Sequence, residues 1–299
     1  MNALTKPQLY LVGAPKAGTS ALADFLDQHP QISMYKLKES NFHCHDLDIS
    51  NKPKTEQQYL SMFSVTPETK LLADGSILSL YSRKAAASIA DYVSKPLILI
   101  ILRNPVDAMY AWYSQMVFVG NEPLRTFQEA INAESERKQG RLIPTYGTVK
   151  SCPQLLFYRD IMRYAEQIER YLSIFARDQI LIFTFDELKA DSMSVYSKIL
   201  NFLELDPFIP KIQKVNVNKI RRMPWLHHFI KKTFAKPANT ILPPKLRSDL
   251  IELIDTINSR ETNRSELNQE LREVLKSECI TDIIKLEKII DKDLSHWYC

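Results

Sequence analysis

The sequence lacks several features that would place it in common classes of protein. Its longest apolar run is Pro96–Leu102, far below the ~20 residues that a membrane-spanning helix needs, and Met1–Pro7 contains no signal-peptide core. The 4 cysteines form no C-x-x-C pair, so reduced thiols are expected. No internal repeat or low-complexity tract is present. These absences predict a cytoplasmic protein without a membrane span.

The charge balance is also too small to indicate a nucleic-acid partner. The 39 Lys and Arg residues exceed the 35 Asp and Glu residues by four. Such a mild basic excess suits an anionic cofactor or an acidic acceptor, but not a polyanion-binding surface. The length of 299 residues accommodates one large α/β domain, and we predict a single domain spanning residues 1–299. The oligomeric state stays open.

Short apolar runs alternate with helical patterns over the first two thirds of the chain. Because the runs are apolar without alternation, each is expected to be covered on both faces, as in a parallel sheet between helices. The predicted strands are Leu9–Val12, Leu71–Asp74, Leu97–Leu102 and Ile180–Phe185, and the predicted helices are Ser20–Gln28, Ser82–Tyr92, Val106–Phe118, Gln154–Phe175 and Ser192–Leu203.

The last third has a different pattern. Asp206–Pro224 is loop-like and basic, and Ser259–Asn268 is a polar connection. The segments Trp225–Phe234, Lys245–Asn258 and Ile280–Ile290 have helical patterns. The predicted fold class is therefore α/β, a P-loop-like parallel sheet flanked by helices, with a helical C-terminal elaboration.

The turn after the first predicted strand carries the clearest chemical signal. Gly13 and Gly18 keep the glycine spacing of an ATP- or GTP-binding loop, G-x-x-x-x-G-K-[ST]. Thr19, however, stands where that loop has its lysine, and the lysine has moved upstream to Lys16. Backbone N–H groups and a lysine at a helix N-terminus form a phosphate site. The altered order predicts a phosphate ligand other than ATP or GTP.

This loop, P-K-A-G-T-S-A-L, resembles the 5′-phosphosulfate loop of sulfotransferases that use 3′-phosphoadenosine-5′-phosphosulfate (PAPS). The resemblance continues in His29-Pro30-Gln31-Ile32, and in K-E-S-N-F-H at 38–43, which is similar to the K-E-x-x-F-F segment of glycan sulfotransferases. The strand ending in Arg103-Asn104-Pro105 resembles the family's 3′-phosphate motif, and D-L-S-H-W at 293–297 resembles the C-terminal ending of many bacterial members.

The resemblance implies a role for each residue of the two phosphate motifs. Lys16 would stabilise the departing 5′-phosphate, and Ala17, Gly18, Thr19 and Ser20 would cradle it. Alone, Lys16 could equally be a solvated loop lysine.

Arg103 would bind the 3′-phosphate. The alternative is a structural salt bridge, because a guanidinium at the end of a buried strand requires an anion.

One part of the 3′-phosphate site departs from the family pattern. The family commonly supplies a serine from the following helix, where this chain has Ala111, and Ser114 is one turn too late. The late basic residues Lys219, Arg221 and Arg222 could compensate, since that loop often closes over the cofactor in the family. The competing interpretation is a solvated basic face.

The resemblance assigns the general base to Glu39. A carboxylate serves as a base near neutral pH when burial or neighbours raise its pKa. The alternative is an exposed glutamate paired with a lysine. His43 is the competing base, because small-molecule sulfotransferases use a histidine, although at a different place in the fold.

Two further patterns offer alternatives to this assignment. His43-Cys44-His45-Asp46 could suggest a metal site, but no second ligand cluster at zinc spacing exists, and we predict no metal. Asp74, at the end of a predicted strand, could be read as the Walker B aspartate of an NTPase. Gly75 replaces the lysine that glycan enzymes tend to carry there.

The sequence therefore predicts a PAPS-dependent sulfotransferase acting on a hydroxyl or amine acceptor, with a carbohydrate or glycolipid favoured by the K-E-S-N-F segment. Two alternatives remain. One is a P-loop kinase or NTPase, which Mg²⁺-dependent ATP turnover would support. The other is a catalytically silent nucleotide-binding protein, which tight binding of the desulfated cofactor PAP without turnover would support.

Overall fold

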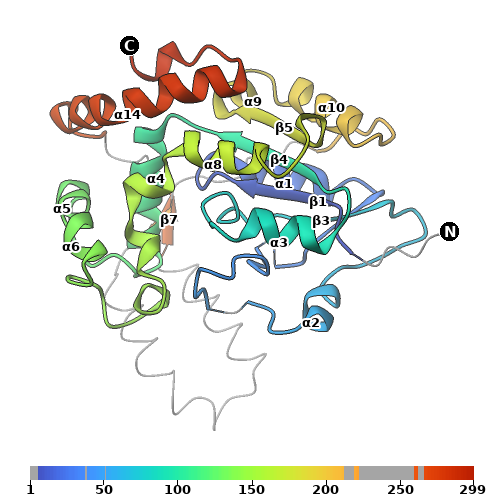
Figure 1. Cartoon of the computed structure of the whole chain (residues 1–299), viewed down its shortest axis with the longest axis horizontal. Coiled ribbons are helices and arrows are strands. Elements are labelled where there is room, and N and C mark those ends of the chain that lie inside the picture. The colour runs from blue at the N-terminus through green and yellow to red at the C-terminus, as the bar shows by residue number, and fades with distance from the viewer. Residues whose placement is uncertain (1–5, 38, 51, 212–218, 222–258, 262–265) are drawn as a thin grey trace, which may run out of the picture.

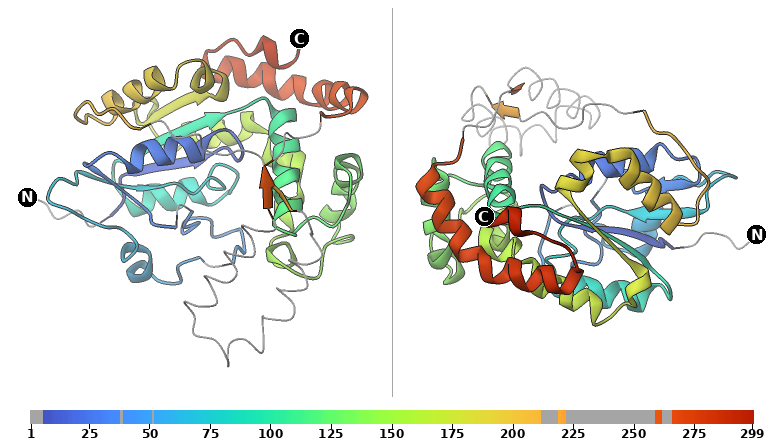
Figure 2. Two further views of the ribbon diagram at one scale, coloured as in Figure 1. Left: turned by 180° about the vertical axis from the view of Figure 1, so that it is seen from behind. Right: turned by 90° about the horizontal axis from the view of Figure 1, so that it is seen from above.

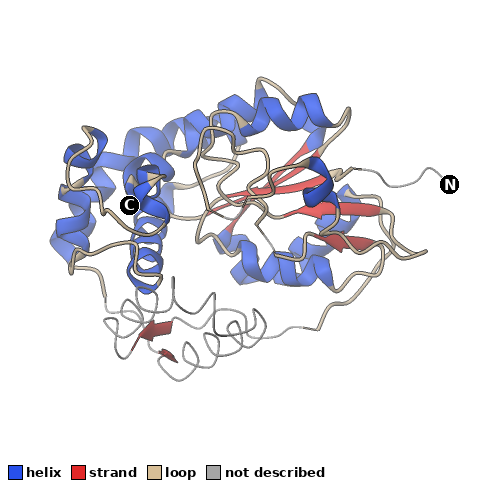
Figure 3. Cartoon of the chain, turned by 90° about the horizontal axis from the view of Figure 1, so that it is seen from below, coloured by secondary structure: helices blue, strands red, loops and turns tan. Residues whose placement is uncertain are grey.

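The computed structural model describes residues 6–37, 39–50, 52–211, 219–221, 259–261 and 266–299. Its centre is a five-stranded sheet in the order β2-β3-β1-β4-β5, and every neighbouring pair of strands is parallel (Figures 1 and 3). The strands are β1 Leu9–Gly13, β2 Ile32–Met34, β3 Leu71–Asp74, β4 Leu97–Leu102 and β5 Ile180–Thr184. This confirms the predicted parallel α/β sheet.

Helices cover both faces of this sheet. Helices α3 and α8 lie against one face, and α1 and α10 lie against the other (Figures 1 and 2). The helix bounds are α1 Thr19–Asp27, α2 Glu56–Leu60, α3 Ala85–Tyr92, α4 Pro105–Phe118, α5 Phe127–Asn132, α6 Glu134–Lys138, α7 Tyr158–Ile161, α8 Tyr164–Leu172, α9 Phe185–Ala190, α10 Ser192–Phe202 and α14 Gln269–Ile290, with 3₁₀ helices at Thr148–Lys150, Pro153–Leu156, Arg177–Gln179 and Ser295–Trp297.

The structure differs from the sequence-based expectation at one strand and one helix. The sequence pattern did not reveal β2, because three residues are too few to carry a periodicity. The long helix predicted over Gln154–Phe175 is three separate pieces. The break before α8 is stabilised by Gln167, whose amide donates to the carbonyls of Asp160 and Ile161 at 3.1 and 3.0 Å.

The strand predicted to include Phe185 ends one residue earlier. Thr184 caps α9 instead, since its hydroxyl accepts from the N–H of Glu187 at 3.1 Å while the Glu187 carboxylate accepts from the N–H of Thr184 at 2.7 Å. This reciprocal capping satisfies two backbone donors and sets the start of the helix. Phe185 thereby becomes a helical residue beside the carboxyl end of the sheet.

The C-terminal elaboration consists of α14 and the short segment after it. Helix α14 begins eleven residues before the predicted start at Ile280, because Asn268 caps it and its apolar residues are widely spaced among charges. Trp297 is 2% exposed, and its indole N–H donates to Asp186 at 2.9 Å. The amide of Asn104 donates to the carbonyl of Trp297 at 3.1 Å. The R-N-P and D-L-x-x-W motifs are therefore joined in space.

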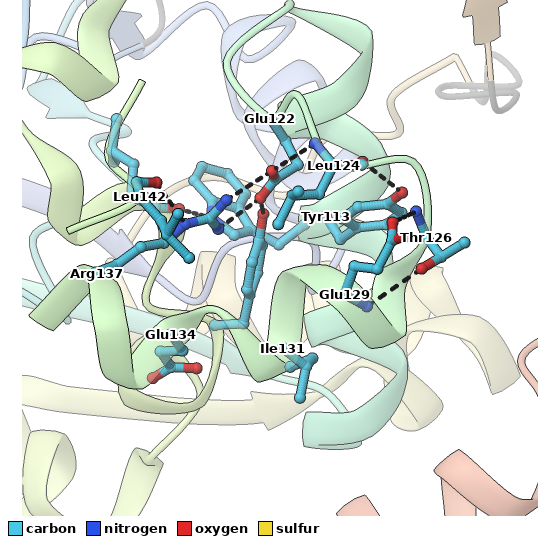
Figure 4. Close-up of polar contacts among 12 residues, drawn as sticks. Tyr113, Glu122, Leu124, Thr126, Glu129, Ile131, Glu134, Arg137 and Leu142 are labelled. Carbon is cyan, nitrogen blue, oxygen red and sulfur yellow. Dashed lines mark hydrogen bonds and ion pairs between the residues drawn. The ribbon is translucent and has the colours of Figure 1, made fainter. Parts of the chain in front are cut away.

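A buried ion pair joins the segment after α4 to α6. The guanidinium of Arg137 donates two hydrogen bonds to the carboxylate of Glu122, at 2.7 and 2.8 Å (Figure 4). Tyr158 donates its hydroxyl to the same carboxylate at 2.6 Å, and the N–H of Leu124 does so at 3.0 Å. The two charged side chains are 1% and 0% exposed. A buried pair is tolerated only with such complete hydrogen bonding.

The last third contributes a short antiparallel pair of strands. The predicted helices Trp225–Phe234 and Lys245–Asn258 lie outside the described residues. Strands β6 (Lys219–Arg221) and β7 (Ser259–Glu261) pair antiparallel, and β7 lies beside α4 (Figure 2). Within the described ranges, no helix combines the length and apolar character needed to cross a bilayer. The single-domain assignment of residues 1–299 stays a prediction.

Candidate functional site

The carboxyl ends of three neighbouring strands bring the predicted site residues to one edge of the sheet. β1 leads into the loop 14–18, β3 ends at Asp74, and β4 is followed directly by Arg103. The strand order β3-β1-β4 makes these ends adjacent. In open parallel sheets the ligand binds outside the carboxyl ends of the strands. The candidate site is therefore built around the β1 loop.

The backbone of that loop requires glycine at its last position. Gly18 precedes α1 with φ +94°, a conformation that residues with a side chain rarely adopt. A Cβ atom there would lie 3.0 Å from both Leu188 Cδ2 and Phe185 Cδ2. Gly18, the N-cap residue of α1, makes no side-chain capping hydrogen bond. An uncapped helix N-terminus behind a tight glycine turn suits an anion.

Lys16 stands in the left-handed region as well, with φ +62°. Its Nζ donates to the side-chain oxygen of Gln115, on α4, at 3.4 Å. Ala17 is fully buried and Thr19 is 3% exposed, whereas Ser20 is half-buried. The loop thus turns the ammonium group toward α4 while its small residues pack inward. The roles predicted for these residues remain predictions.

Arg103 lies directly against this loop. Its Nη1 donates to the carbonyl of Lys16 at 3.1 Å, and its guanidinium carbon is 4.7 Å from the centre of the Phe185 ring. No ion pair among the described residues includes Arg103. The guanidinium is therefore positioned by a carbonyl and a ring, and its charge is not offset by a carboxylate in this part of the chain.

The neighbouring helix does not supply the family's serine. Ala111 is 1% exposed and packs into the core, and the hydroxyl of Ser114 donates to the carbonyl of Tyr110 at 2.8 Å. Of the three late basic residues, Lys219 and Arg221 have a described backbone in β6 but no described side chains, and Arg222 lies outside the described residues. Whether this segment completes the 3′-phosphate site stays a prediction.

The segment that carries Glu39 follows β2 and crosses to the end of β3. Glu39 is partly exposed, and its N–H donates to the carbonyl of Leu37 at 2.8 Å. The next residue, Ser40, is buried and donates its hydroxyl to Asp74. Glu39 is therefore partly accessible to solvent, while the residue after it is buried and hydrogen-bonded to Asp74. Lys38, the preceding residue of the motif, is not described.

Asp74 is a buried carboxylate surrounded by hydroxyl groups. Ser40, Ser76 and Tyr59 all donate to it, the tyrosine at 2.7 Å. Burial raises the pKa of Asp74, and the three hydroxyl hydrogen bonds oppose that rise. Both carboxylate oxygens already accept hydroxyls, which is unlike an exposed Walker B carboxylate that holds a hydrated magnesium ion. The surroundings therefore do not favour the NTPase interpretation.

His43, the competing base, is a core residue. It is 3% exposed, its Nδ1 lies 2.9 Å from Ser88 Oγ, and its ring makes edge contacts with Tyr10 and Phe42. Burial, with a smaller effect of His45, lowers its pKa to about 3. A histidine with so low a pKa is a weak proton acceptor. Between the two candidates the geometry favours Glu39.

Other residues of the motifs have structural surroundings. The Nε2 of His29 lies 3.0 Å from the carbonyl of Asp206, and its Nδ1 accepts from the N–H of Gln31 at 3.1 Å, so this motif joins the end of α1 to a distant loop. In the described residues, no group of three or more His, Cys, Asp or Glu side chains is arranged to hold a metal ion.

Sequence reasoning missed Gln115 and Tyr59 as site residues. Both lie in segments without a motif, and only the fold brings them to the lysine and the carboxylate. Ser40 belongs to the K-E-S segment, and its hydroxyl beside Glu39 is a sequence signal that could have placed it at the site.

A scan against protein-family models matches residues 6–237 to the sulfotransferase domain. The chain belongs to this family. Among curated proteins, this sulfotransferase is 29% identical over 210 residues to the human bifunctional heparan sulfate N-deacetylase/N-sulfotransferase 1, and 26% identical over 208 residues to its Caenorhabditis briggsae counterpart. These alignments cover 66% and 68% of the chain but only 22% and 23% of the relatives, so the chain spans less than a quarter of their length.

A solved structure agrees over nearly the whole chain. The crystal structure of a sulfotransferase from Alicyclobacillus acidocaldarius is 25% identical, with a TM-score of 0.73, and the match covers 98% of this chain and 99% of that one. The fold and the enzyme class expected from the sequence are thereby confirmed: the chain is a sulfotransferase that transfers a sulfuryl group.

Proposed function

We propose that this sulfotransferase takes the sulfuryl group from PAPS and transfers it to a hydroxyl or amine of a carbohydrate or glycolipid. One observation carries the choice of donor: the guanidinium of Arg103 is hydrogen-bonded to the carbonyl of Lys16 itself. Lys16 belongs to the turn before α1, and Arg103 is hydrogen-bonded to that turn, so two cationic side chains start from the same helix N-terminus. PAPS carries phosphates at two positions, and this pair supplies one cation for each.

Glu39, Lys16 and the β1 loop then have separate roles in an in-line transfer. The acceptor oxygen or nitrogen forms a bond to sulfur as the bond from sulfur to the bridging phosphate oxygen breaks. Glu39 takes the proton that the acceptor loses, and the charge that develops on the 5′-phosphate is stabilised by Lys16 and the N–H groups around Gly18 and Thr19. Such catalysis depends on positioning and on charge stabilisation.

The acceptor class is supported by the K-E-S-N-F segment and by the names of the relatives. The two curated relatives are named for N-sulfation of heparan sulfate. That activity is theirs, and for this chain it supports a glycan acceptor without separating a hydroxyl from an amine. A cytoplasmic location remains part of the same proposal.

Thermal unfolding with nucleotides tests the donor. PAP should raise the melting temperature, because a ligand that binds only the folded state stabilises it. ATP with Mg²⁺ should have a smaller effect, since Thr19 replaces the lysine of an ATP-binding loop. Protection by ATP and none by PAP would contradict the proposal and favour a kinase or NTPase.

Arg103→Ala separates the two phosphate sites. The variant should lose roughly 1.5–3 kcal/mol of PAPS binding, the scale of a charge-assisted hydrogen bond. Its affinity for adenosine 5′-phosphosulfate should barely change, because that nucleotide has no 3′-phosphate. Equal losses for both nucleotides would show that Arg103 acts on the loop and not on the 3′-phosphate.

A further inference from the structure

The segment after Glu39 is fixed residue by residue to one carboxylate. Ser40 donates its hydroxyl to Asp74. The N–H of Asn41 donates to the Ser76 hydroxyl at 2.9 Å, and that hydroxyl donates in turn to Asp74. The N–H of Phe42 donates to the Ser40 hydroxyl at 3.1 Å. Three consecutive residues therefore depend on Asp74, directly or through one serine.

An aromatic contact adds a fourth connection. The rings of Phe42 and Tyr59 stack with centres 4.3 Å apart and an angle of 11° between planes. Tyr59 is fully buried and donates its hydroxyl to Asp74 at 2.7 Å. The ring that packs against the Glu39 segment is thus oriented by the same carboxylate. Asn41 adopts φ +49°, so the turn is tight and has little freedom to shift.

The carboxylate is costly to keep in this position. Asp74 is 2% exposed, and none of the ion pairs among the described residues includes it. A buried charge without a cation lowers stability unless hydrogen bonds offset its desolvation. An asparagine or threonine at this position would avoid that cost. A carboxylate, however, accepts from three hydroxyls at once, which neither replacement can do.

We propose that Asp74 is a positioning residue for sulfuryl transfer: by accepting the hydroxyls of Ser40, Ser76 and Tyr59 it fixes the backbone that presents Glu39 to the acceptor. This inference rests on the proposed function, in which Glu39 is the base. It assigns a task to a buried carboxylate that acts through the backbone of its neighbours. It also gives a reason for an acid at the end of β3, where Gly75 follows it.

A double-mutant cycle tests the connection between the two carboxyl groups. Asp74→Asn should lower kcat about 10- to 100-fold, the cost of misplacing a catalytic group, and leave the KM for PAPS within about twofold. Glu39→Gln should lower kcat by roughly 10²–10⁴-fold. Adding Asp74→Asn to Glu39→Gln should then change kcat by less than about twofold, since no base is left to position.

Glu122→Gln provides the matched control, because Glu122 is also a buried carboxylate that accepts a tyrosine hydroxyl. Any loss of kcat that it causes should persist in full when Glu39→Gln is added. Independent, multiplicative effects of Asp74→Asn and Glu39→Gln would overturn the proposal. If Asp74→Asn does not fold, Ser40→Ala takes its place in the cycle with the same expectations.

Hydrogen exchange gives a readout that needs no acceptor. In the wild-type chain the amides of Asn41 and Phe42 should exchange slowly, and in Asp74→Asn they should exchange at least about tenfold faster, while amides of β4 are unchanged. Unaltered exchange would overturn the proposal. A chain that passes this exchange test but neither binds PAP nor turns over an acceptor would contradict the proposed function and leave the positioning contacts established.

Discussion

Glu122 and Asp74 are both buried carboxylates that accept a tyrosine hydroxyl. They differ in their other partners. Glu122 also accepts two N–H groups from Arg137. Among the described residues, the side chains that donate to Asp74 do so through hydroxyls, and burial raises its pKa. The first arrangement joins the segment after α4 to α6 and α7. The second lies at the end of β3, beside the segment that carries Glu39.

The difference indicates which network stabilises the fold and which orients a segment. A bidentate arginine neutralises a carboxylate and fixes two elements against each other. Hydroxyls leave the charge in place, so the carboxylate remains a strong acceptor and the segment bound to it is precisely oriented at some cost in stability. We therefore expect substitutions among Arg137, Glu122 and Tyr158 to lower mainly the free energy of unfolding. Substitutions of Asp74 and its hydroxyl donors should lower mainly kcat.

The largest expected effect is on stability, from Arg137→Ala. This change leaves Glu122 buried without its cation and should lower the free energy of unfolding by about 3–5 kcal/mol in a denaturant titration. Arg141→Ala is the control, because Arg141 and its partner Glu136 are 56% and 41% exposed. It should cost less than about 1 kcal/mol. Equal costs for the two variants would remove the basis of the comparison.

The second effect concerns His43, a buried group that shares the surroundings of Asp74. Its pKa of about 3 in the folded chain is below the ordinary value of 6.5. Between these values the unfolded chain binds more protons, so the stability from His43 is complete above pH 6.5 and is lost as the pH falls toward 3. Lowering the pH from 7 to 4.5 should therefore cost roughly 2–3 kcal/mol.

Denaturant titrations at both pH values check this with three variants, of which His43→Gln and Asp74→Asn should act in opposite directions. His43→Gln should remove most of the acid loss, whereas His45→Gln, at an exposed position, should leave most of it. Asp74→Asn should steepen it: because the pKa of Asp74 is raised by folding, protonation of Asp74 favours the folded chain at acid pH and offsets part of the loss. An unchanged acid loss in His43→Gln would show that other groups cause it.

The sequence was sufficient for those parts of the fold where apolar runs and chain order agree. β3 and β4 have the predicted bounds, and the turn at Gly18 was found from its spacing. Local pattern failed where distant residues decide the structure. The predicted helix Gln154–Phe175 breaks because the Gln167 amide satisfies carbonyls before α8, a contact that no periodicity reveals.

The same division holds for the candidate site. Lys16 and Arg103 belong to short motifs, and the parallel sheet brings them within one hydrogen bond of each other. Gln115 and Tyr59 belong to no motif. Each is brought to the site by the packing of its own helix, so the sequence gives no signal for it. The sequence shows Asp74 as an acid at the end of a predicted strand, but its hydroxyl partners come from three separate segments. Its role could not be derived before the fold was known.

The smallest expected effect separates the two networks most directly. Tyr59 and Tyr158 are both fully buried and donate to a carboxylate at 2.7 and 2.6 Å. Replacing either with phenylalanine removes one hydroxyl, keeps the ring, and should lower the free energy of unfolding by roughly 1–2 kcal/mol. Tyr59→Phe should also lower kcat by about three- to tenfold at unchanged KM for PAPS, because Asp74 loses one of the donors that orient it and the Phe42 ring loses a fixed partner.

Tyr158→Phe should leave kcat within about twofold, since its carboxylate holds helices and not the Glu39 segment. Steady-state kinetics and denaturant unfolding, measured on the same samples, compare kcat between two variants that have lost similar amounts of unfolding free energy. A loss of kcat of the same size in Tyr158→Phe would mean that turnover follows general stability, and that the two carboxylates do not have separate tasks.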